Sequence, residues 1–542
     1  MLRTEQIAGS RHLPGPAVEM RGHWPRAGIA AAYLLLSIVT VGGLLIGDYP
    51  LAVDFPNHAA RLFIECNASD PVLSRMYTVE YTLIPNLAID LLNRPFCGLV
   101  DSMTFLRLTM AGTLTGILLV VWLLHRFLNQ GSTAFVLLAP AMTFNLVTSM
   151  GYLNFLIGTF LFLLFAWAML RFDVLARHKA LAFVIPNLFG AAIFFCHVFA
   201  LGLAGVFLFG SRFAVEQGRP WISRGIRAGL LSVISFVVPV VLIILAERSG
   251  FGVYYAIAAK FRALWAAMLY SSVFVAAGLS MLWAVFAYWS FREKLVTIDP
   301  RVRWPLLFLG LFAVMLPSGL LEAVDIDSRC LVSVIYLAIG ALTLRSGAAA
   351  EGLRKAQVAA AIVAILTVVV QLGSAIPKMR LFDQQVAELR GALNAIGPAD
   401  AVLTMGELDA NTEVPQHFYW HLASYATLDR RAFNPHEFTG RGMQPLRANS
   451  PFQCIDPSAG RTLGVFAARQ LLDPNMADAL SEDENSHLRY AFLWDRRFDY
   501  VLYFHFGKAD NPVPSVLRPT HRGSFFTIFR VQNAIGPNGP CD

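Results

Sequence analysis

Charged residues are scarce in this chain. Of its 542 residues, only 15% are Asp, Glu, Lys or Arg, whereas 56% are hydrophobic. Soluble domains of ordinary composition carry about a quarter charged residues. The low charge therefore excludes a protein that is soluble along its whole length, and the mean hydropathy of +0.56 indicates a membrane protein.

The sequence also lacks the common local signatures of nucleotide-binding enzymes and serine hydrolases. It has no Walker loop, Rossmann fingerprint or nucleophile elbow, and no internal repeat or low-complexity segment. His417 and His421 have the i, i+4 spacing of metal ligands, but HFYWH lacks the Glu of a zincin motif. Two ligands are also fewer than zinc usually has. We therefore predict no cofactor and no protein-bound metal, and dependence on a divalent cation stays open.

Apolar runs recur along the chain, and many are long enough to cross the roughly 30 Å hydrocarbon core of a bilayer. The first run follows a basic tail and is too long for the apolar core of a cleaved signal peptide, so we interpret it as a retained signal anchor. We predict eleven spans, at residues 27–47, 104–124, 133–149, 151–170, 180–195, 197–211, 228–246, 265–290, 304–321, 330–344 and 356–376.

The distribution of basic residues sets the topology. If the tail at 1–26 is cytoplasmic, the cytoplasmic segments hold nineteen Lys and Arg, and the outer connections hold seven. This asymmetry is typical of a multi-pass protein of the bacterial inner (plasma) membrane. The net charge of +7 is thus a topology signal and predicts no nucleic-acid partner.

With an odd number of spans and a cytoplasmic N-terminus, everything after the last span lies on the outer side of the membrane. Residues 27–376 form the transmembrane domain, and residues 377–542 form an extracytoplasmic domain on the periplasmic side, long enough to fold by itself. Its pattern is α/β, so the predicted fold is a polytopic α-helical membrane protein with a small C-terminal α/β domain. We expect helices at 381–396 and around 417–428, and strands at 401–405, 498–506 and 524–531.

The first outer connection, residues 48–103, has a pattern of its own. From 55 to 66 the apolar residues share one helical face and the polar residues share another. Asp54 suits the N-cap of this helix, and Pro56 suits its first turn. We therefore predict an amphipathic helix in the membrane interface. A second, interrupted apolar stretch at 81–100 predicts a juxtamembrane helix.

Four of the six cysteines fall in the predicted outer segments. An oxidising compartment would allow the disulfides Cys66–Cys97 and Cys454–Cys541. Unpaired buried thiols are the alternative interpretation.

Polar side chains that suit chemistry are concentrated in three outer connections. They are Asp54, His58 and Arg61 in the first, His197 in the third, and Glu322, Asp325, Asp327 and Arg329 in the fifth. Because charges at membrane depth usually face a cavity or each other, we expect these residues to converge beneath the outer domain. Each also has a plainer explanation: a helix cap for the first Asp, packing or headgroup contacts for the histidines and arginines, and a hydrated turn for the other acids.

Three segments resemble a known family. They are VDFPNHAARLFI (53–64), SMGYLNFLIG (149–158) and LPSGLLEAVDIDSR (316–329). With the long first outer loop, the number of spans and the outer domain, they resemble the GT-C superfamily of integral-membrane glycosyltransferases. Phe55 departs from the commonest pattern of that family, in which adjacent Asp and Glu follow the first span.

The resemblance implies an enzyme that takes a sugar from a polyprenyl-phosphate donor at the membrane surface. The acceptor would be an envelope glycan, lipid or protein. Asp54 takes the catalytic acidic position, as general base of an inverting transfer, and Arg329 would stabilise the leaving phosphate. Substrate contacts would come from the other candidates: His58, Arg61, His197, Glu322, Asp325 and Asp327.

Two other functions compete with this one. A transporter or flippase of an envelope lipid would carry ionisable residues near mid-span, often with paired broken helices. A non-enzymatic envelope-assembly protein would tolerate the loss of Asp54 and depend on the surface of its outer domain.

Overall fold

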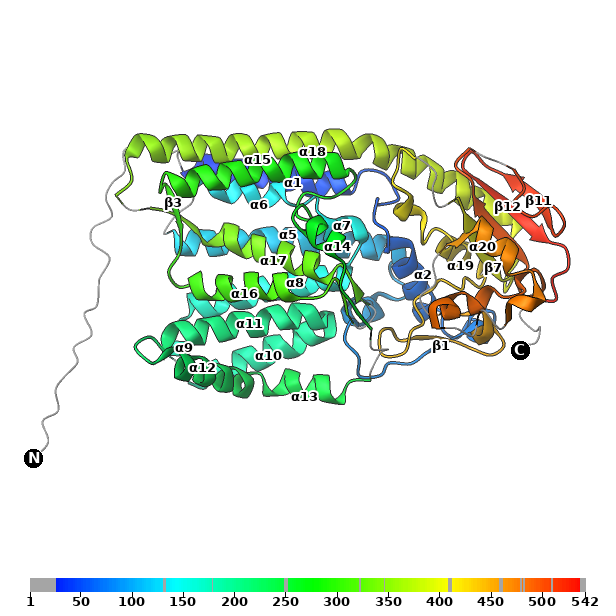
Figure 1. The fold of residues 1–542 in the computed structure, drawn as a ribbon, viewed down its shortest axis with the longest axis horizontal. Coiled ribbons are helices and arrows are strands. Elements are labelled where there is room, and N and C mark those ends of the chain that lie inside the picture. Colours follow the sequence, from blue (N-terminus) through cyan, green and yellow to red (C-terminus); the bar gives the residue numbers. More distant parts are fainter. Residues whose placement is uncertain are drawn as a thin grey trace, which may run out of the picture.

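The molecule is an α-helical polytopic membrane protein with a C-terminal α/β domain, as predicted. Figure 1 shows the helices side by side at one end and the C-terminal domain at the other, with the long helix α18 reaching both. The computed structural model describes residues 26–129, 133–177, 179–247, 252–320, 323–345, 347–407, 412–457, 462–477, 480, 483–507 and 510–536.

Long apolar helices make up most of the bundle. Six described helices are long and apolar enough to cross a membrane, namely α1, α5, α8, α11, α15 and α18, and a seventh span results if the pair α12 and α13, bent by 69°, is one span. The bounds are α1 (Arg26–Leu44), α5 (Ser102–Leu128), α8 (Leu153–Arg171), α10 (Leu181–Cys196), α11 (Val198–Val215), α12 (Trp221–Ser235), α13 (Val237–Leu245), α15 (Val273–Arg292), α16 (Arg303–Met315), α17 (Ile326–Ala341) and α18 (Ala350–Ala392).

The predicted span at 133–149 is not one helix. It consists of η2 (Ala134–Leu137), α6 (Leu138–Ala141) and α7 (Leu146–Met150), all buried. A continuous helix would have to accommodate Pro140, which lacks an N–H. The chain then starts again at Asn145, whose side-chain oxygen accepts from the N–H groups of residues 147 and 148 at 2.9 and 3.1 Å. That cap satisfies the donors of a short helix in apolar surroundings.

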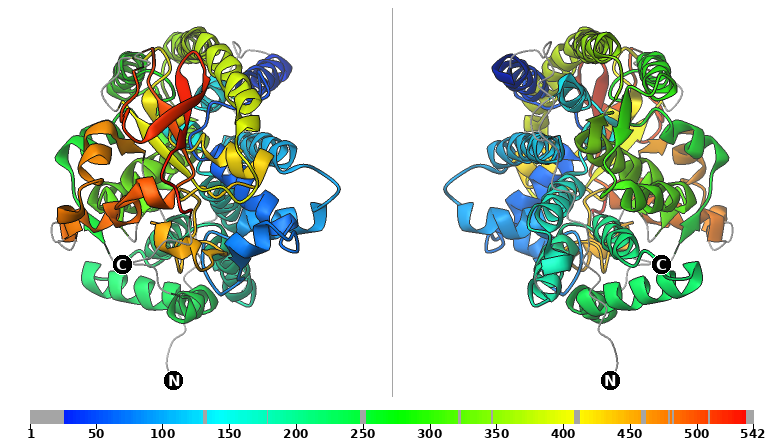
Figure 2. Two further views of the ribbon diagram at one scale, coloured as in Figure 1. Left: turned by 90° about the vertical axis from the view of Figure 1, so that its right-hand side faces the viewer. Right: turned by 90° about the vertical axis from the view of Figure 1, so that its left-hand side faces the viewer.

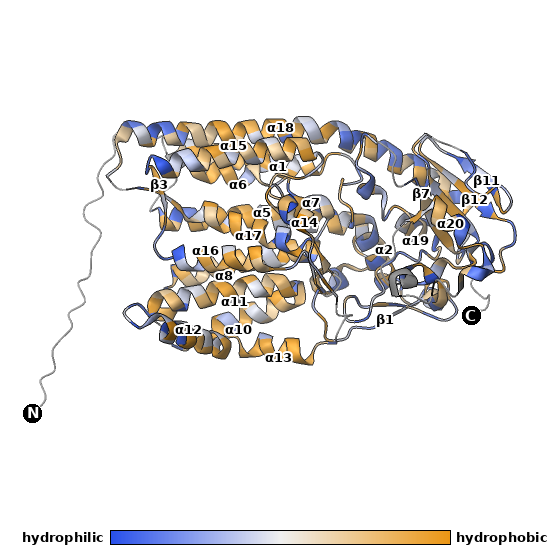
Figure 3. Cartoon of the chain, viewed as in Figure 1, coloured by the Kyte–Doolittle hydropathy of each residue, from blue (hydrophilic) through white to orange (hydrophobic). Residues whose placement is uncertain are grey.

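Two other predicted helix boundaries also differ. The span expected at 265–290 begins as a helix only at Val273, and the carbonyls of 266 and 268 instead accept from Leu146 N and from the Gln371 amide. The helix expected at 381–396 is the continuation of the last span, since α18 runs through Pro377 without a break. Figure 3 shows α18 mostly hydrophobic along the bundle and hydrophilic beyond it.

The C-terminal domain is built on a mixed five-stranded sheet in the order β11-β12-β10-β7-β9. The three expected strands are present, and β7 and β10 pair in parallel with Val402 opposite Tyr500. The sequence did not indicate β11, an exposed edge strand that contains Pro519. The bounds are β7 (Val402–Gly406), β9 (Leu463–Gly464), β10 (Tyr500–Phe504), β11 (Leu517–Arg522) and β12 (Phe526–Val531).

The first outer loop lies between the bundle and this domain. Its amphipathic helix α2 (Phe55–Cys66) has the predicted bounds, and the juxtamembrane helix is reduced to α4 (Ala88–Asn93) and η1 (Arg94–Phe96). Strand β1 (Tyr77–Val79) pairs antiparallel with β8 (Leu446–Ala448). The loop therefore belongs to the outer layer of the molecule. Figure 2 shows that layer from the side of the C-terminal domain.

The structure shows the state of each cysteine among the described residues. The Cys66–Cys97 disulfide is present, with 5.1 Å between the Cα atoms. Cys454 is disulfide-bonded, and its predicted partner Cys541 lies outside the described residues. Cys196 and Cys330 are buried thiols.

Short elements complete the fold. Those that precede α18 in the chain include five strands, which form two small sheets, β2-β4-β5 and β3-β6. These elements are α3 (Leu73–Met76), α9 (Val174–Arg177), β2 (Val253–Tyr254), α14 (Ile257–Ala263), β3 (Val296–Ile298), β4 (Gly319–Leu320), β5 (Ala323–Val324) and β6 (Leu342–Leu344). The C-terminal domain adds η3 (Leu393–Ala395), η4 (Gln416–Tyr419), α19 (Ser424–Arg430), η5 (Phe452–Ile455), α20 (Val465–Gln470), η6 (Pro474–Ala477), η8 (Asp483–Ala491) and α21 (Trp494–Arg497).

Candidate functional site

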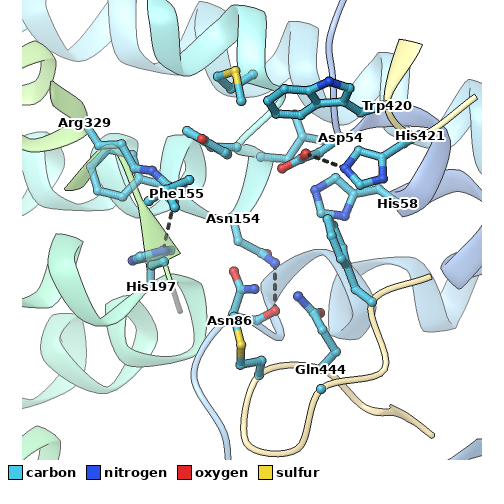
Figure 4. A pocket seen from close by; sticks show the side chains of 18 residues that line it. Asp54, His58, Asn86, Asn154, Phe155, His197, Arg329, Trp420, His421 and Gln444 are labelled. Atoms are coloured by element: carbon cyan, nitrogen blue, oxygen red, sulfur yellow. Dashed lines mark hydrogen bonds and ion pairs between the residues drawn. The ribbon is translucent and has the colours of Figure 1, made fainter. Parts of the chain in front are cut away.

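A cavity of about 240 Å³ lies where the bundle, the first outer loop and the C-terminal domain meet. Five separate parts of the chain supply polar side chains to it, and Figure 4 shows these side chains together. Its lining residues are Asp54, His58, Asn86, Met150, Tyr152, Leu153, Asn154, Phe155, His197, Ala323, Val324, Arg329, Trp420, His421, Phe438, Gly440, Met443 and Gln444.

The backbone holds Asp54 against the turn between α7 and α8. The N–H groups of Val53 and Asp54 donate to the carbonyls of Ser149 and Met150, both at 3.0 Å. Gly151 ends α7 with φ of 75°, and a Cβ atom there would lie 3.3 Å from the Asp54 nitrogen. A glycine is therefore needed where this turn approaches the start of α2.

Asp54 occupies the predicted N-cap position of α2, but its side chain makes no capping hydrogen bond. The carboxylate lines the cavity instead, with Oδ1 3.5 Å from Nε2 of His421. Burial raises the pKa of Asp54 to about 7, although the positive charges of Arg329 and Arg61 oppose the shift. A carboxyl group with this pKa exchanges protons near neutral pH, as a general base requires.

Arg329 faces Asp54 from across the cavity (Figure 4). Its guanidinium carbon lies 3.3 Å from the centre of the Tyr152 ring, and its Nη1 lies 3.3 Å from Nε2 of His197. Its Nε has no hydrogen-bond partner, and no carboxylate among the described residues forms an ion pair with it. Since Arg329 is only 6% exposed, it is a buried cation that makes no direct ion pair with a carboxylate of the described residues.

His197 adds a second donor beside this cation. The ring caps α11, because its Nδ1 accepts from the N–H of Phe199 at 3.2 Å. A neutral ring that accepts at Nδ1 carries its proton on Nε2. The Nε2–H of His197 and the N–H of Arg329 then face each other as two donors. An anion placed between them would accept from both, so the arrangement suits a phosphate oxygen.

Of the other two candidates in the first outer loop, only His58 lines the cavity. His58 lines the cavity, and burial with the charge of Arg61 lowers the pKa of its ring. Arg61 does not line the cavity: its Nε and Nη2 donate to Asp90 at 2.8 and 3.3 Å, and both side chains are fully buried. Arg61 is thus held in an internal ion pair with Asp90 of α4 and lies outside the cavity where a substrate contact was expected of it.

The acidic residues of the fifth outer connection also have protein partners. Asp325 pairs with Arg262, and Asp327 pairs with Lys260 at 2.9 Å. Neither carboxylate lines the cavity that holds Asp54. The third candidate of this group, Glu322, lies outside the described residues.

A second cavity of about 560 Å³ adjoins the first. The two share the side chains of Met150, Val324 and Trp420 as a common wall. Asp325 and His417 line the second cavity, whereas His421 lines the first. The histidine pair considered as metal ligands is therefore divided between two cavities, and no group of three potential ligands occurs among the described residues.

Sequence reasoning missed the residues that the C-terminal domain contributes. Trp420, His421, Phe438 and Gln444 all line the cavity, and they come from two segments of the predicted periplasmic part. Their local patterns carry no sign of a shared site with Asp54. The only available signal was the position of the domain at the same membrane face.

The comparison with solved structures finds an overall similarity. No family model and no curated protein matches the chain. The chain is similar to the crystal structure of ArnT from Cupriavidus metallidurans bound to undecaprenyl phosphate, with a TM-score of 0.46 and 11% identity over 95% of this chain and 99% of that chain. A likeness this weak carries no functional argument, so function is inferred from the site.

Proposed function

We propose that the protein is a membrane glycosyltransferase of GT-C type that moves a sugar from a polyprenyl-phosphate donor to an envelope acceptor. The observation that carries the proposal is a single cavity that joins a carboxyl group titrating near neutral pH to a buried arginine without a carboxylate partner among the described residues. The first group suits a general base, and the second suits a leaving phosphate.

The reaction assigns one bond change to each group. Asp54 takes the proton of an acceptor hydroxyl while the hydroxyl oxygen attacks the anomeric carbon of the donor sugar. The bond between this carbon and the phosphate oxygen breaks, and the polyprenyl phosphate leaves with the electron pair. Arg329 and the Nε2–H of His197 donate to the phosphate oxygens as their charge grows. Attack opposite the leaving group inverts the configuration at the anomeric carbon.

The position of the cavity supports a lipid-linked donor. It lies at the end of an apolar bundle, and most of its lining away from the charged groups is apolar, including Leu153, Phe155 and Val324. A polyprenyl chain can stay in the bilayer while its phosphate reaches such a site. The asymmetry of Lys and Arg residues supports our assignment of this end of the bundle to the periplasmic side of the inner membrane.

The distribution of charge in the bundle favours an enzyme over a transporter. In the described membrane helices apart from α18, with α12 and α13 taken as one span, charged side chains lie near the ends, such as Arg107 in α5, Arg171 in α8 and Arg292 in α15. Among the described residues one bent helix pair occurs, and neither Ser235 nor Phe236 at its bend carries a charge. A substrate path through the bilayer would be expected to carry charges at mid-span.

The decisive experiment is sugar transfer by purified protein in liposomes that contain a radiolabelled polyprenyl-phosphate sugar, with envelope extract as the source of acceptor. Asp54→Asn removes the base and keeps the side-chain volume, so the rate should fall about 10²- to 10⁴-fold. Asp48→Asn is the matched control, because this carboxylate of the same loop is 85% exposed. Equal rates in the two variants would refute the role of Asp54.

A further inference from the structure

His421 reaches the cavity from the C-terminal domain. It lies between η4 and α19, and its carbonyl accepts from the N–H of Ser424 at the start of α19. The ring is only 8% exposed, and its centre lies 5.2 Å from that of Phe438 in an edge-on contact. The ring of His58 also contacts Phe438 edge-on, at 6.0 Å. One aromatic ring of the C-terminal domain thus holds both imidazoles beside Asp54.

The contact with His421 is the only ion pair or hydrogen bond of the Asp54 carboxylate in the described part of the chain. The closest atoms, Nε2 and Oδ1, are 3.5 Å apart, and contacts of this kind often shorten when substrate binds. Burial lowers the pKa of His421 to about 4, so the ring is neutral at neutral pH. Its effect on the carboxylate is therefore that of a hydrogen-bond donor, without a positive charge.

Specific contacts fix the C-terminal domain against the helix that carries Asp54. The side-chain nitrogen of Asn57 donates to the His436 carbonyl at 2.7 Å, and the Phe438 N–H donates to the Asn57 side-chain oxygen at 3.4 Å. Helix α19 packs against α2 on the same side. The position of His421 relative to Asp54 is therefore set by the docking of the domain.

We propose that His421 is a positioning residue for the general base, supplied by the C-terminal domain. Its Nε2–H donates to Oδ1 of Asp54, which orients the carboxylate and leaves Oδ2 to take the proton of the acceptor. This inference rests on the proposed glycosyl transfer and deepens it. The C-terminal domain would then take part in the chemistry. If the domain did not dock, Asp54 would lack the Nε2–H donor of His421 that orients its carboxylate.

The loss of His421 should change the pKa of Asp54, and the neighbouring charged groups set the background for this change. A donor to the carboxylate stabilises its ionised form, so replacing His421 by an apolar ring should raise the pKa of Asp54. The other groups that face the pair stay in place. They are Arg61, Arg329, Asp325 and Tyr152 around Asp54, and His58 and His436 around His421.

Kinetics of two variants test the proposal. His421→Phe should lower kcat about 10- to 100-fold at pH 7 with KM within twofold of wild type, since the acceptor is still bound but the base is misoriented. The acid limb of the pH profile should move up by about one pH unit. His421→Gln, whose amide can donate from a similar place, should recover most of the rate and the original limb. His521→Phe, on exposed β11, is the control.

A direct titration keeps the test independent of sugar transfer. Dicyclohexylcarbodiimide reacts with protonated carboxyl groups in apolar surroundings, and mass spectrometry of the Asp54 peptide gives the extent of labelling at each pH. The midpoint should rise in His421→Phe and return toward wild type in His421→Gln. Unchanged midpoints and pH profiles in all variants would overturn the inference. A raised midpoint in a protein that transfers no sugar would reject the proposed function and retain the contact.

Discussion

The buried charge of Arg329 leads to a prediction that separates a catalytic role from a structural one. Arg329→Met keeps a side chain of similar length and removes the charge. In the proposed reaction it withdraws the donors nearest to the leaving phosphate, and removing one preorganised donor costs about 10²–10³ in kcat, or about 2.7–4 kcal/mol. Arg522→Met, at an exposed position on β11, makes the same chemical change as a control.

The same variant has a second, pH-dependent effect. Arg329 lowers the pKa of Asp54, whose value is about 7 with the arginine present. Without this cation the pKa of Asp54 rises, so less of the base is ionised at pH 7 and more is recovered as the pH increases. The kcat of Arg329→Met should therefore recover part of its loss between pH 7 and pH 9, beyond any rise seen in wild type.

The stability of Arg329→Met should change little. The variant loses the stacking of the guanidinium on Tyr152, worth about 0.5–2 kcal/mol. It also removes a buried donor without a partner, whose burial costs about 1–3 kcal/mol. The free energy of unfolding, measured by thermal unfolding in detergent, should thus fall by no more than about 1 kcal/mol while transfer is lost. A large loss of stability, or a kcat within threefold of wild type over the whole pH range, would refute the reasoning.

Two further predictions concern the first outer loop. Arg61→Met should destabilise the protein by about 3–5 kcal/mol, because it leaves Asp90 buried without its partner. Thermal unfolding measures this loss. A stable but inactive variant would instead indicate that Arg61 contacts the substrate. The double variant Cys66→Ser with Cys97→Ser should lower stability by about 3–4 kcal/mol, since the disulfide closes a loop with a sequence separation of 31. Unfolding of the double variant and of wild type, both without reductant so that the disulfide of Cys454 stays intact, checks this value, and equal midpoints would contradict it.

Local sequence patterns predicted the helix that carries Asp54 well. The apolar periodicity, Pro56 and the acidic cap position are all local features, and α2 has the expected bounds. The surroundings of its polar face could not be predicted in the same way. Arg61 meets Asp90 across 29 residues, and no periodicity within either segment reports this pairing.

Apolar composition predicted the bundle better than it predicted the individual helices. Each predicted span corresponds to helical structure, but 133–149 is broken near Pro140 and Asn145, and the last span continues far into the C-terminal domain. Hydropathy measures how apolar a segment is, whereas the breaks depend on caps and on carbonyls that accept from neighbouring helices.

The sequence by itself determined that this chain is a polytopic α-helical membrane protein with a C-terminal α/β domain, because apolar run length and residue periodicity are properties of each segment alone. Only the tertiary structure decided which polar side chains share a cavity. Asp54, Arg329 and His421 meet because α2, α17 and the C-terminal domain pack together, and Asp325 and Asp327 are paired elsewhere by Arg262 and Lys260. Such pairings depend on which helices lie side by side, and a single sequence contains no local signal for that arrangement.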